Sequence, residues 1–328
     1  MGREYLGSAG ALGRLGGRPV TQGADTYASK KAGPSISGRL FRRRASSGQV
    51  KALRYLLLAP AVVLTVLIVF VPLLMALGES VGFDDGWSLE AFRTVLTQSP
   101  YPIVLKNTFV IAGIVTFFAL LLAAPAAAFI ARQSSRTSGV LLALIVASLW
   151  ISVLVKMFAW QVVLGRLGPL NDLLRFIGLT DAPISMLYTR GAVVISMVHF
   201  MIPHACILLV AAMRRVDWEI IIAASTLGAK AGLIFREAYW PQIRLSFIMT
   251  ALIVFVLSSA FFVAPALLGG PGETMIGMQM KSDLSTRYDS GLPAATGILL
   301  TLSLILVSGI AVLMTGGSFR KATRELAK

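Results

Sequence analysis

Long apolar stretches separated by short polar connections dominate the chain after residue 54. Each of six stretches can cross a hydrocarbon core of about 30 Å as an α-helix, at about 1.5 Å per residue. Because lipid offers no partners for backbone N–H and C=O groups, helices are the expected conformation. The pattern predicts an all-α polytopic membrane protein. The predicted spans are approximately 55–77, 107–131, 139–164, 191–213, 246–268 and 294–315.

The composition agrees with a membrane location. Of the 328 residues, 56% are hydrophobic and only 14% are charged, whereas a soluble domain has about 25% charged residues. The single cysteine, Cys206, lies in an apolar stretch, so no disulfide can form within the chain. The formal net charge of +15 raises the question of a nucleic-acid partner, and the placement of the charges answers it.

Lys and Arg residues are divided unevenly between the two sides of the predicted membrane. With the N-terminus inside the cell, 22 of the 30 fall in cytoplasmic segments, seven fall in external loops, and Lys156 lies within a span. A cytoplasmic excess of Lys and Arg is the positive-inside pattern, and it predicts that both termini are cytoplasmic. The net charge is mainly a topology signal, and we expect no nucleic-acid partner.

Two basic tails flank the predicted six-span domain, which covers residues 55–315. Residues 1–54 contain eleven Lys or Arg and two acids, with little apolar periodicity. Such a segment cannot bury enough surface to offset the entropy lost on ordering, so we expect a disordered cytoplasmic tail. A segment that binds anionic lipid or regulates the protein is the alternative. Residues 316–328 form the second cytoplasmic tail.

The longest cytoplasmic connection, residues 214–245, has the pattern of two short helices. Asp217 can cap a helix over residues 218–227, and Gly228 follows its last apolar position as a C-terminal stop. A second helical stretch is expected from residue 229 or 230 to about residue 240. We expect Pro241 to break or bend that stretch before the fifth span.

This connection resembles the cytoplasmic signature E-A-A-x3-G-x9-I-x-L-P of the inner-membrane permease subunits of ATP-binding-cassette (ABC) importers. The matching residues are Ala223, Ala224, Gly228 and Pro241, whereas Ile222, Ala238 and Trp240 stand where the signature has Glu, Ile and Leu. The resemblance implies that the connection is a coupling loop that docks on a cytoplasmic ATPase. The residues assigned to this role are Ile222, Ala223, Ala224, Leu227, Gly228, Ala229 and Pro241.

Three further stretches resemble the spermidine/putrescine branch of this family. They are "LWISVLVKMFAWQVVLGRLGPLN" at 149–171, "MLYTRGAVVISMVHFMIPH" at 186–204 and "FFVAPALLGGPGETMIG" at 261–277. The resemblance implies a type I ABC importer permease fold in a bacterial inner membrane. It also implies three kinds of partner besides membrane lipid: ABC ATPase subunits, a second homologous permease subunit, and a periplasmic substrate-binding protein. The implied substrate is a polyamine or a related small amine.

Nucleotide and metal chemistry find no support in the residue pattern. The chain has no G-x-x-x-x-G-K-[ST] phosphate-binding loop, so we expect no cofactor on this chain, with ATP and Mg²⁺ held by the partner ATPase. His199 and His204 would point about 140° apart on a helix, which disfavours a shared metal ion. No spacing of nucleophile, base or paired carboxylates indicates an enzyme active site.

Lys156 is the only Lys or Arg well inside a predicted span. Its charge should face protein or a watery cavity, or else snorkel toward the membrane surface. The predicted spans contain no Asp or Glu, so we expect a low-affinity path and leave substrate choice to the binding protein and the second permease subunit. The residues considered for this path, with ordinary packing as the alternative, are Ser152, Lys156, Trp160, His199, Ser258, Ser259 and Phe262. Pro125, Pro203 and Pro265 are kinks or hinges of the spans.

The function predicted from these observations is that of a transport subunit without enzymatic activity of its own. It would move a small solute, delivered by a periplasmic binding protein, into the cytoplasm. One alternative is a secondary transporter or channel that works alone, although such a protein would be expected to carry an acid within its spans. Another is a membrane scaffold that moves no solute.

Overall fold

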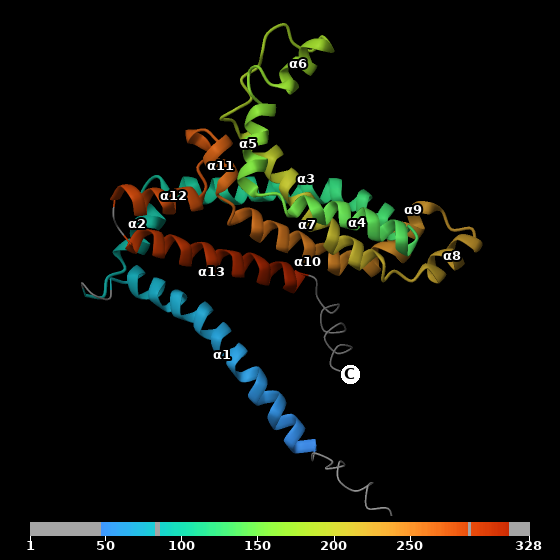
Figure 1. Cartoon of the computed structure of the whole chain (residues 1–328), viewed down its shortest axis with the longest axis horizontal. Helices are drawn as coiled ribbons and strands as arrows, with labels where there is room; N and C mark the ends of the chain where they lie inside the picture. The colour runs from blue at the N-terminus through green and yellow to red at the C-terminus, as the bar shows by residue number, and fades with distance from the viewer. Residues whose placement is uncertain (1–46, 83–85, 288–289, 315–328) are drawn as a thin grey trace, which may run out of the picture. The chain divides into compact units, whose positions relative to one another are not determined.

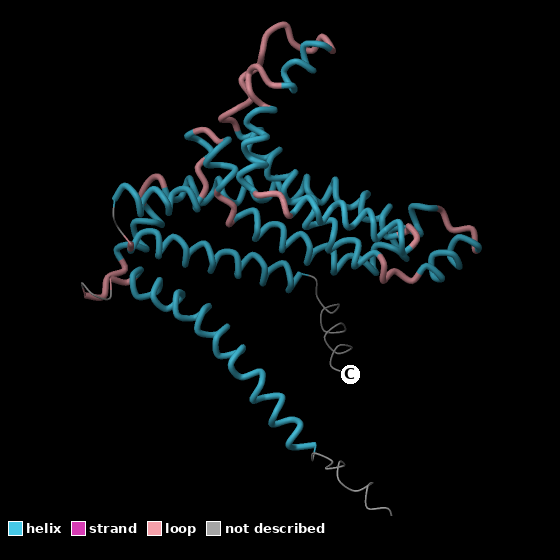
Figure 2. The backbone as a smooth tube through the Cα atoms, viewed as in Figure 1, coloured by secondary structure: helices cyan, strands magenta, loops and turns pink. Residues whose placement is uncertain are grey.

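The computed structural model of the protein describes residues 47–82, 86–287 and 290–314, and all regular structure in these ranges is helical (Figures 1 and 2). Most of the predicted basic tails, residues 1–46 and 315–328, lies outside the described residues. The end of the N-terminal tail was predicted to lack structure, yet residues 47–54 belong to the first helix. The described residues divide into two units between Val62 and Val63, and the packing described below is that of the second.

The helices run in the following order along the chain: α1 (Ser47–Ser80), α2 (Glu90–Thr97), α3 (Tyr101–Ala131), α4 (Ser135–Leu149), α5 (Val153–Val163), α6 (Pro169–Phe176), α7 (Arg190–Met213), α8 (Trp218–Thr226), α9 (Ala231–Leu233), a π-helix η2 (Ile234–Tyr239), α10 (Trp240–Ser259), α11 (Val263–Leu268), a 3₁₀ turn η3 (Pro271–Glu273), α12 (Ile276–Ser282), a π-helix η4 (Asp283–Arg287) and α13 (Gly291–Met314).

Six helical segments are long and apolar enough to cross a membrane, as predicted. Their bounds extend beyond the apolar cores seen in the sequence, so three of them include an acid near one end: Glu79, Asp172 and Glu237. The expectation that no span contains an acid is therefore wrong at the ends of these helices. The six segments are Leu58–Ser80, Tyr101–Ala131, Val153–Phe176, Arg190–Met213, Ala231–Ser259 and Gly291–Leu313.

Two predicted spans are not continuous helices. The stretch 139–164 divides into α4 and α5, because the backbone leaves helical geometry before Ser152, whose ψ of 137° makes it the N-cap of α5. The stretch 246–268 divides into α10 and α11. Pro265 accounts for the second break, since its ring would clash with the carbonyl of Phe261 in an uninterrupted helix. Pro125 and Pro203, by contrast, lie inside the unbroken helices α3 and α7.

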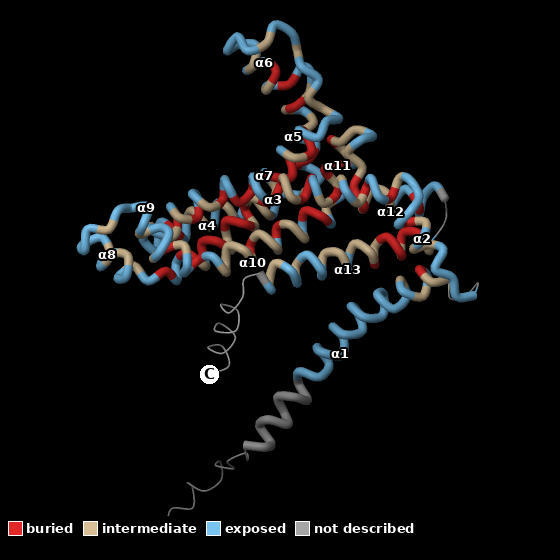
Figure 3. The backbone as a smooth tube through the Cα atoms, turned by 180° about the vertical axis from the view of Figure 1, so that it is seen from behind, coloured by how far each residue is buried: buried red, intermediate tan, exposed pale blue. Residues whose placement is uncertain are grey.

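The core of the second unit lies between α3 and α7, with α10 packed against both. Small residues of α3 occupy the buried positions between these helices, including Ala112, Ala119, Ala123 and Ala127, each fully buried. Small side chains let two membrane helices approach closely, which is how helices associate when lipid removes the hydrophobic driving force between them. The red segments of Figure 3 follow this α3–α7 contact.

Candidate functional site

The connection between α7 and α10, called here the α8 loop (residues 214–241), folds as its local chemistry predicts. The Asp217 side chain caps α8 by accepting a hydrogen bond from the Glu219 backbone N–H at 3.0 Å. Gly228 has a φ of +80°, which lets the chain leave the helix. The Ala229 N–H then donates to the Ala224 carbonyl at 3.1 Å, and the Gly228 N–H to the Ser225 carbonyl at 3.0 Å, the two bonds of a Schellman cap.

Within the described chain, α8 buries none of its residues. Trp218 and Ile221 pack partly against the core, and the Trp218 ring lies 6.1 Å from the ring of Tyr239. Other apolar residues of α8 and its C-terminal cap are exposed: Ile222 is 60% exposed and Leu227 is 87% exposed. An exposed apolar surface of this kind indicates a docking surface for another protein.

The residues assigned to coupling do not all lie together. Ile222, Ala223, Ala224, Leu227, Gly228 and Ala229 are on α8 and its cap, whereas Pro241 is an exposed residue of α10. Pro241 does not end the second helix, because helical structure continues from Ala231 through Ser259. The wider π turn η2 precedes Pro241 and accommodates the missing N–H and the bulk of the ring.

Gln242 ties α8 to α10, which local sequence patterns do not reveal. Its Oε1 accepts a hydrogen bond from the Asp217 N–H at 2.8 Å, and its Nε2 donates to the Ala238 carbonyl at 2.9 Å. The first bond joins the start of α8 to the start of α10, across 25 residues of sequence. The second satisfies a carbonyl in the π turn. Gln242 is therefore a positioning residue for α8.

Three of the residues assigned to the translocation path meet where α5 approaches α7. The Trp160 Nε1–H donates to Nδ1 of His199 at 3.3 Å, and Lys156 Nζ lies 5.1 Å from the centroid of the Phe200 ring. Lys156 is only 6% exposed. Because an indole N–H only donates, a neutral His199 carries its own proton on Nε2. Lys156, His199 and Trp160 thus form a donor-rich cluster within the membrane-spanning part.

The other residues assigned to the path are Ser259, Ser258, Ser152 and Phe262, and their surroundings differ. Ser259 donates to the Phe255 carbonyl at 2.8 Å, whereas the buried Ser258 hydroxyl has no hydrogen-bond partner among the described residues. Ser152 is the exposed N-cap of α5. Phe262 lines an open groove of about 490 Å³ with Met280 and Lys281.

His199 and His204 have different partners, in line with their predicted orientations. His199 accepts from Trp160, whereas Nδ1 of His204 lies 3.1 Å from the Phe200 carbonyl. No group of three or more His, Cys, Asp or Glu in the described ranges is arranged to hold a metal ion.

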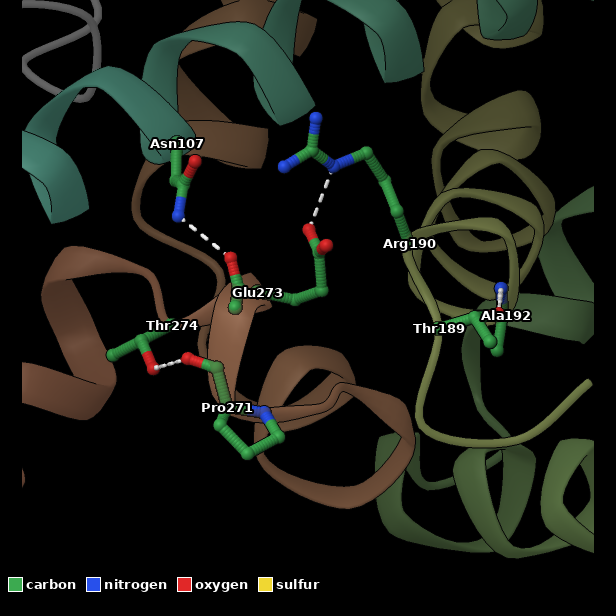
Figure 4. A network of polar contacts seen from close by, with 8 residues as sticks. Asn107, Thr189, Arg190, Ala192, Pro271, Glu273 and Thr274 are labelled. Atoms are coloured by element: carbon green, nitrogen blue, oxygen red, sulfur yellow. Dashed lines mark hydrogen bonds and ion pairs between the residues drawn. The ribbon is translucent and has the colours of Figure 1, made fainter.

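The Gly-rich turn, residues 269–275, is fixed to two helices (Figure 4). Asn107 of α3 donates from Nδ2 to the Gly272 carbonyl at 2.8 Å, and Arg190 of α7 pairs with Glu273 at 2.7 Å. A Cβ on Gly270 would lie 2.5 Å from the Tyr188 carbonyl oxygen, so the turn and that carbonyl are in close contact. Local sequence patterns do not reveal these three attachments.

A buried carboxylate lies near the same end of α3, at a position the sequence did not single out. Asp283 is 1% exposed and accepts hydrogen bonds from Tyr101 Oη at 3.1 Å and from Gln279 Nε2 at 2.9 Å. The first bond joins the junction of α12 and η4 to the start of α3, and the second lies within that junction. Asp283 thus helps to fix the elements that follow the Gly-rich turn.

Comparison with known proteins establishes what kind of protein carries these features. The profile of the family described as "Binding-protein-dependent transport system inner membrane component" matches residues 119–316. The chain belongs to this family. It is thus a multi-pass permease of the inner membrane and a subunit of an ABC importer, as the α8 loop signature implied.

Several named permeases are similar in sequence. The permease is 29% identical over 269 residues to the spermidine/putrescine transport system permease protein PotB of Escherichia coli (strain K12), covering 80% of this chain and 95% of that protein. PotB of Haemophilus influenzae is 28% identical over 246 residues, 73% of this chain and 86% of that protein. The thiamine transport system permease protein ThiP of E. coli is 31% identical over 204 residues, but these cover only 37% of ThiP.

Solved transporters share the fold. A chain in the crystal structure of a bacterial alginate ABC transporter in complex with an alginate pentasaccharide-bound periplasmic protein superposes with a TM-score of 0.69. Its sequence identity is 17%, with 82% of the permease and 95% of that chain covered. A second structure, of a bacterial ABC transporter involved in the import of alginate, gives a TM-score of 0.64 at 18% identity. The type I permease fold predicted from the sequence is confirmed.

Proposed function

We propose that the permease moves a polyamine or a related small amine into the cytoplasm, with energy supplied by separate ATPase subunits. A periplasmic binding protein delivers the solute, and a second homologous permease forms the other half of the pathway. Both termini and the α8 loop are cytoplasmic. The similarity to PotB over 80% of the chain supports the substrate class, and the uneven placement of Lys and Arg supports the orientation.

The exposed apolar surface of α8 carries the proposal. A helix capped by Asp217 and Gly228 is a rigid element that leaves Ile222 and Leu227 in the open. Docked in a groove of the ATPase, it would follow the movement of that subunit on ATP binding. The bond from Asp217 to Gln242 would pass the movement to α10 and so bias the spans between inward-open and outward-open states.

The remaining assignments concern the path. The donor-rich cluster of Lys156, Trp160 and His199 offers a polycation no attraction, which fits a low-affinity path whose selectivity lies in the binding protein. ATP and Mg²⁺ belong to the partner ATPase, and the permease itself binds no cofactor.

The test of coupling uses proteoliposomes that hold both permease subunits, the ATPase and the binding protein. Ala224→Arg and Gly228→Trp place bulk on the docking surface, and we expect loss of ATPase co-purification and of ATP-driven uptake with normal insertion in the membrane. A Cβ on Gly228 meets no atom within 4 Å, but its φ of +80° strains any other residue, so Ala224→Arg is the variant that tests docking without this strain. Unchanged ATPase binding in both variants would refute the assignment of α8.

The substrate is tested separately, on the cognate binding protein. A thermal-shift screen with putrescine, spermidine, amino acids and thiamine should show stabilisation by the polyamines. Stabilisation by a solute that is not an amine would remove the polyamine assignment and leave the role of α8 unaffected.

A further inference from the structure

A second recess lies beneath α8, on the side away from the exposed Leu227. This α8 groove has a volume of about 360 Å³ and is lined by Ala128, Arg132, Trp218, Ile221, Ala231, Ile234, Phe235 and Tyr239. Its volume is within the range of small-molecule sites, about 300–1,000 Å³. Neither the coupling role of α8 nor the translocation path uses these residues.

The walls of the α8 groove come from the ends of two membrane-spanning helices. Ala128 and Arg132 belong to the end of the span Tyr101–Ala131 and the residue that follows it, and Ala231 is the first residue of the span Ala231–Ser259. The recess is therefore at the boundary between lipid and water. Its aromatic lining, Trp218, Phe235 and Tyr239, has the composition of the belt that membrane proteins place at this level.

One cation lies in this aromatic and aliphatic lining. The Arg132 guanidinium carbon is 4.9 Å from the centroid of the Trp218 ring, within the range of a cation–π contact. Arg132 has no ion pair and no side-chain hydrogen bond within the described part of the chain. A planar guanidinium with free donors matches the geometry of a phosphate.

The residues around the α8 groove carry a net positive charge, as Arg132 does. The α3–α4 connection with the start of α4 and the segment 214–244 together contain seven Lys or Arg and three acids. The acids are already engaged or turned to solvent: Asp217 caps α8, Glu237 pairs with Arg236 at 3.2 Å, and Glu219 is exposed. The local field therefore favours an anion.

We propose that the α8 groove binds an anionic phospholipid of the surrounding membrane. The lipid phosphate accepts hydrogen bonds from Arg132, and the apolar part of the lipid lies along Ile221, Ile234 and Phe235. The lipid touches α3, α8 and η2 at once, so it holds the coupling helix against the ends of two spans. The groove would bind this lipid whatever solute the permease transports. The proposal therefore goes beyond the transport function and does not depend on the substrate.

Trp218 makes the site observable by fluorescence. The full chain, paired with the second permease subunit and measured with and without the ATPase subunits, is placed in nanodiscs that contain brominated phosphatidylglycerol or brominated phosphatidylcholine at equal mole fraction. The Trp218 signal is the difference between the wild type and Trp218→Phe. We expect phosphatidylglycerol to quench it with about fivefold higher apparent affinity, the effect of roughly one basic residue at an anionic surface.

Matched variants separate the site from general surface charge. Arg132→Gln should abolish the preference for phosphatidylglycerol, whereas Arg136→Gln should keep it, because Arg136 is exposed and does not line the groove. Ala231→Phe is a second test, which blocks the groove without changing its charge. Because Ala231 is exposed and lines the groove, a ring at this position should fill the groove and reduce quenching by both lipids.

Four results would overturn the proposal. They are equal quenching by the two lipids in the wild type, a preference that survives Arg132→Gln, loss of quenching on addition of millimolar inorganic phosphate, and loss of quenching when the ATPase subunits bind. The third result would assign the groove to a soluble phosphate compound, and the fourth to the partner protein. Lipid binding is read without any transport step, so failure of the proposed transport function would leave the result intact.

Discussion

The Gly-rich turn and the α8 loop lie at opposite ends of α3, and they are attached to the protein in opposite ways. Asn107, Arg190 and the carbonyl of Tyr188 hold the turn on three sides. The α8 helix buries no residue, and its start is tied to α10 by a single bond to Gln242. Contacts within the chain therefore hold the turn in place, whereas α8 keeps most of its surface for contacts outside the chain.

Glycine serves these two regions for different reasons. Gly270 is required by space, because a Cβ there would be 2.5 Å from an oxygen of the backbone. Gly228 is required by conformation: its φ is +80°, and a Cβ would meet no atom within 4 Å. A substitution at Gly270 should therefore clash with the backbone of the folded chain, whereas a substitution at Gly228 should strain the end of α8 and place bulk on its docking surface.

The largest expected effect is on the partner contact of α8. Leu227→Asp should weaken ATPase binding more than about tenfold, since burying a leucine side chain contributes about 1.5–3 kcal/mol and a buried unpaired carboxylate is unfavourable. Titration of the ATPase onto nanodiscs that contain the permease pair measures this. Leu167→Asp is the control, because Leu167 is 93% exposed but lies between α5 and α6. Equal loss in both variants would mean that α8 has no special role.

The next largest effect is expected in the Gly-rich turn, which contacts within the chain hold in place. Gly270→Ala should lower the free energy of unfolding by about 1–3 kcal/mol, the usual range for overpacking. Gly272→Ala, in the same turn, meets no atom within 4 Å and should change stability little. Thermal unfolding of the purified subunit in detergent compares the two. Similar melting temperatures would show that the turn moves freely and is not fixed.

A smaller effect is expected at the tie between α8 and α10. Gln242→Ala removes the hydrogen bond that joins α8 to α10, which contributes about 1 kcal/mol, so amide hydrogen exchange across α8 should become about threefold to tenfold faster. Gln133→Ala is the control, since Gln133 makes only a long bond of 3.4 Å to the Phe129 carbonyl. Unchanged exchange in α8 would leave Trp218 as its main anchor.

The smallest effect is expected for the coupling energy of the ion pair in the Gly-rich turn. A double-mutant cycle with Arg190→Ala and Glu273→Gln should give a coupling energy of about 0.2–1 kcal/mol, because the Arg190 side chain is 45% exposed. The coupling should shrink as salt rises. A value near zero at low salt would mean that Asn107 and close packing alone hold the turn.

Local chemistry made the α8 loop predictable. A capping Asp, an apolar helix face and a Gly after it are signals within a dozen residues, and the structure has helix, cap and stop where these signals placed them. The break before Ser152 left no such signal, since hydropathy does not register the end of a helix inside an apolar stretch. Pro241 does not break its helix, because a π turn, which depends on the backbone on both sides, can absorb a proline; a bend at Pro241, the other expectation, stays a prediction.

Contacts between distant residues could not be predicted from patterns. Trp160 and His199 are 39 residues apart, and Asn107 and Gly272 are 165 apart. Each residue type was a reasonable candidate for a polar contact, but only the packing of α3, α5 and α7 decides which ones meet. The same packing places Phe262 in a groove with Met280 and Lys281 and sets Lys156 against the Phe200 ring, neither of which the sequence indicated.

The π turn η2 gives the helix from Ala231 to Ser259 a mechanical property. A π turn holds one more residue than the α turn it replaces, and η2 lies between the α8 loop and the 20 residues of α10. If that extra residue passes out of η2, everything on its N-terminal side rotates by about 100° and advances by about 1.5 Å relative to α10. A combined rotation and translation of this size at the base of the α8 loop needs no flexible loop. It would leave the helical structure of α10 unchanged.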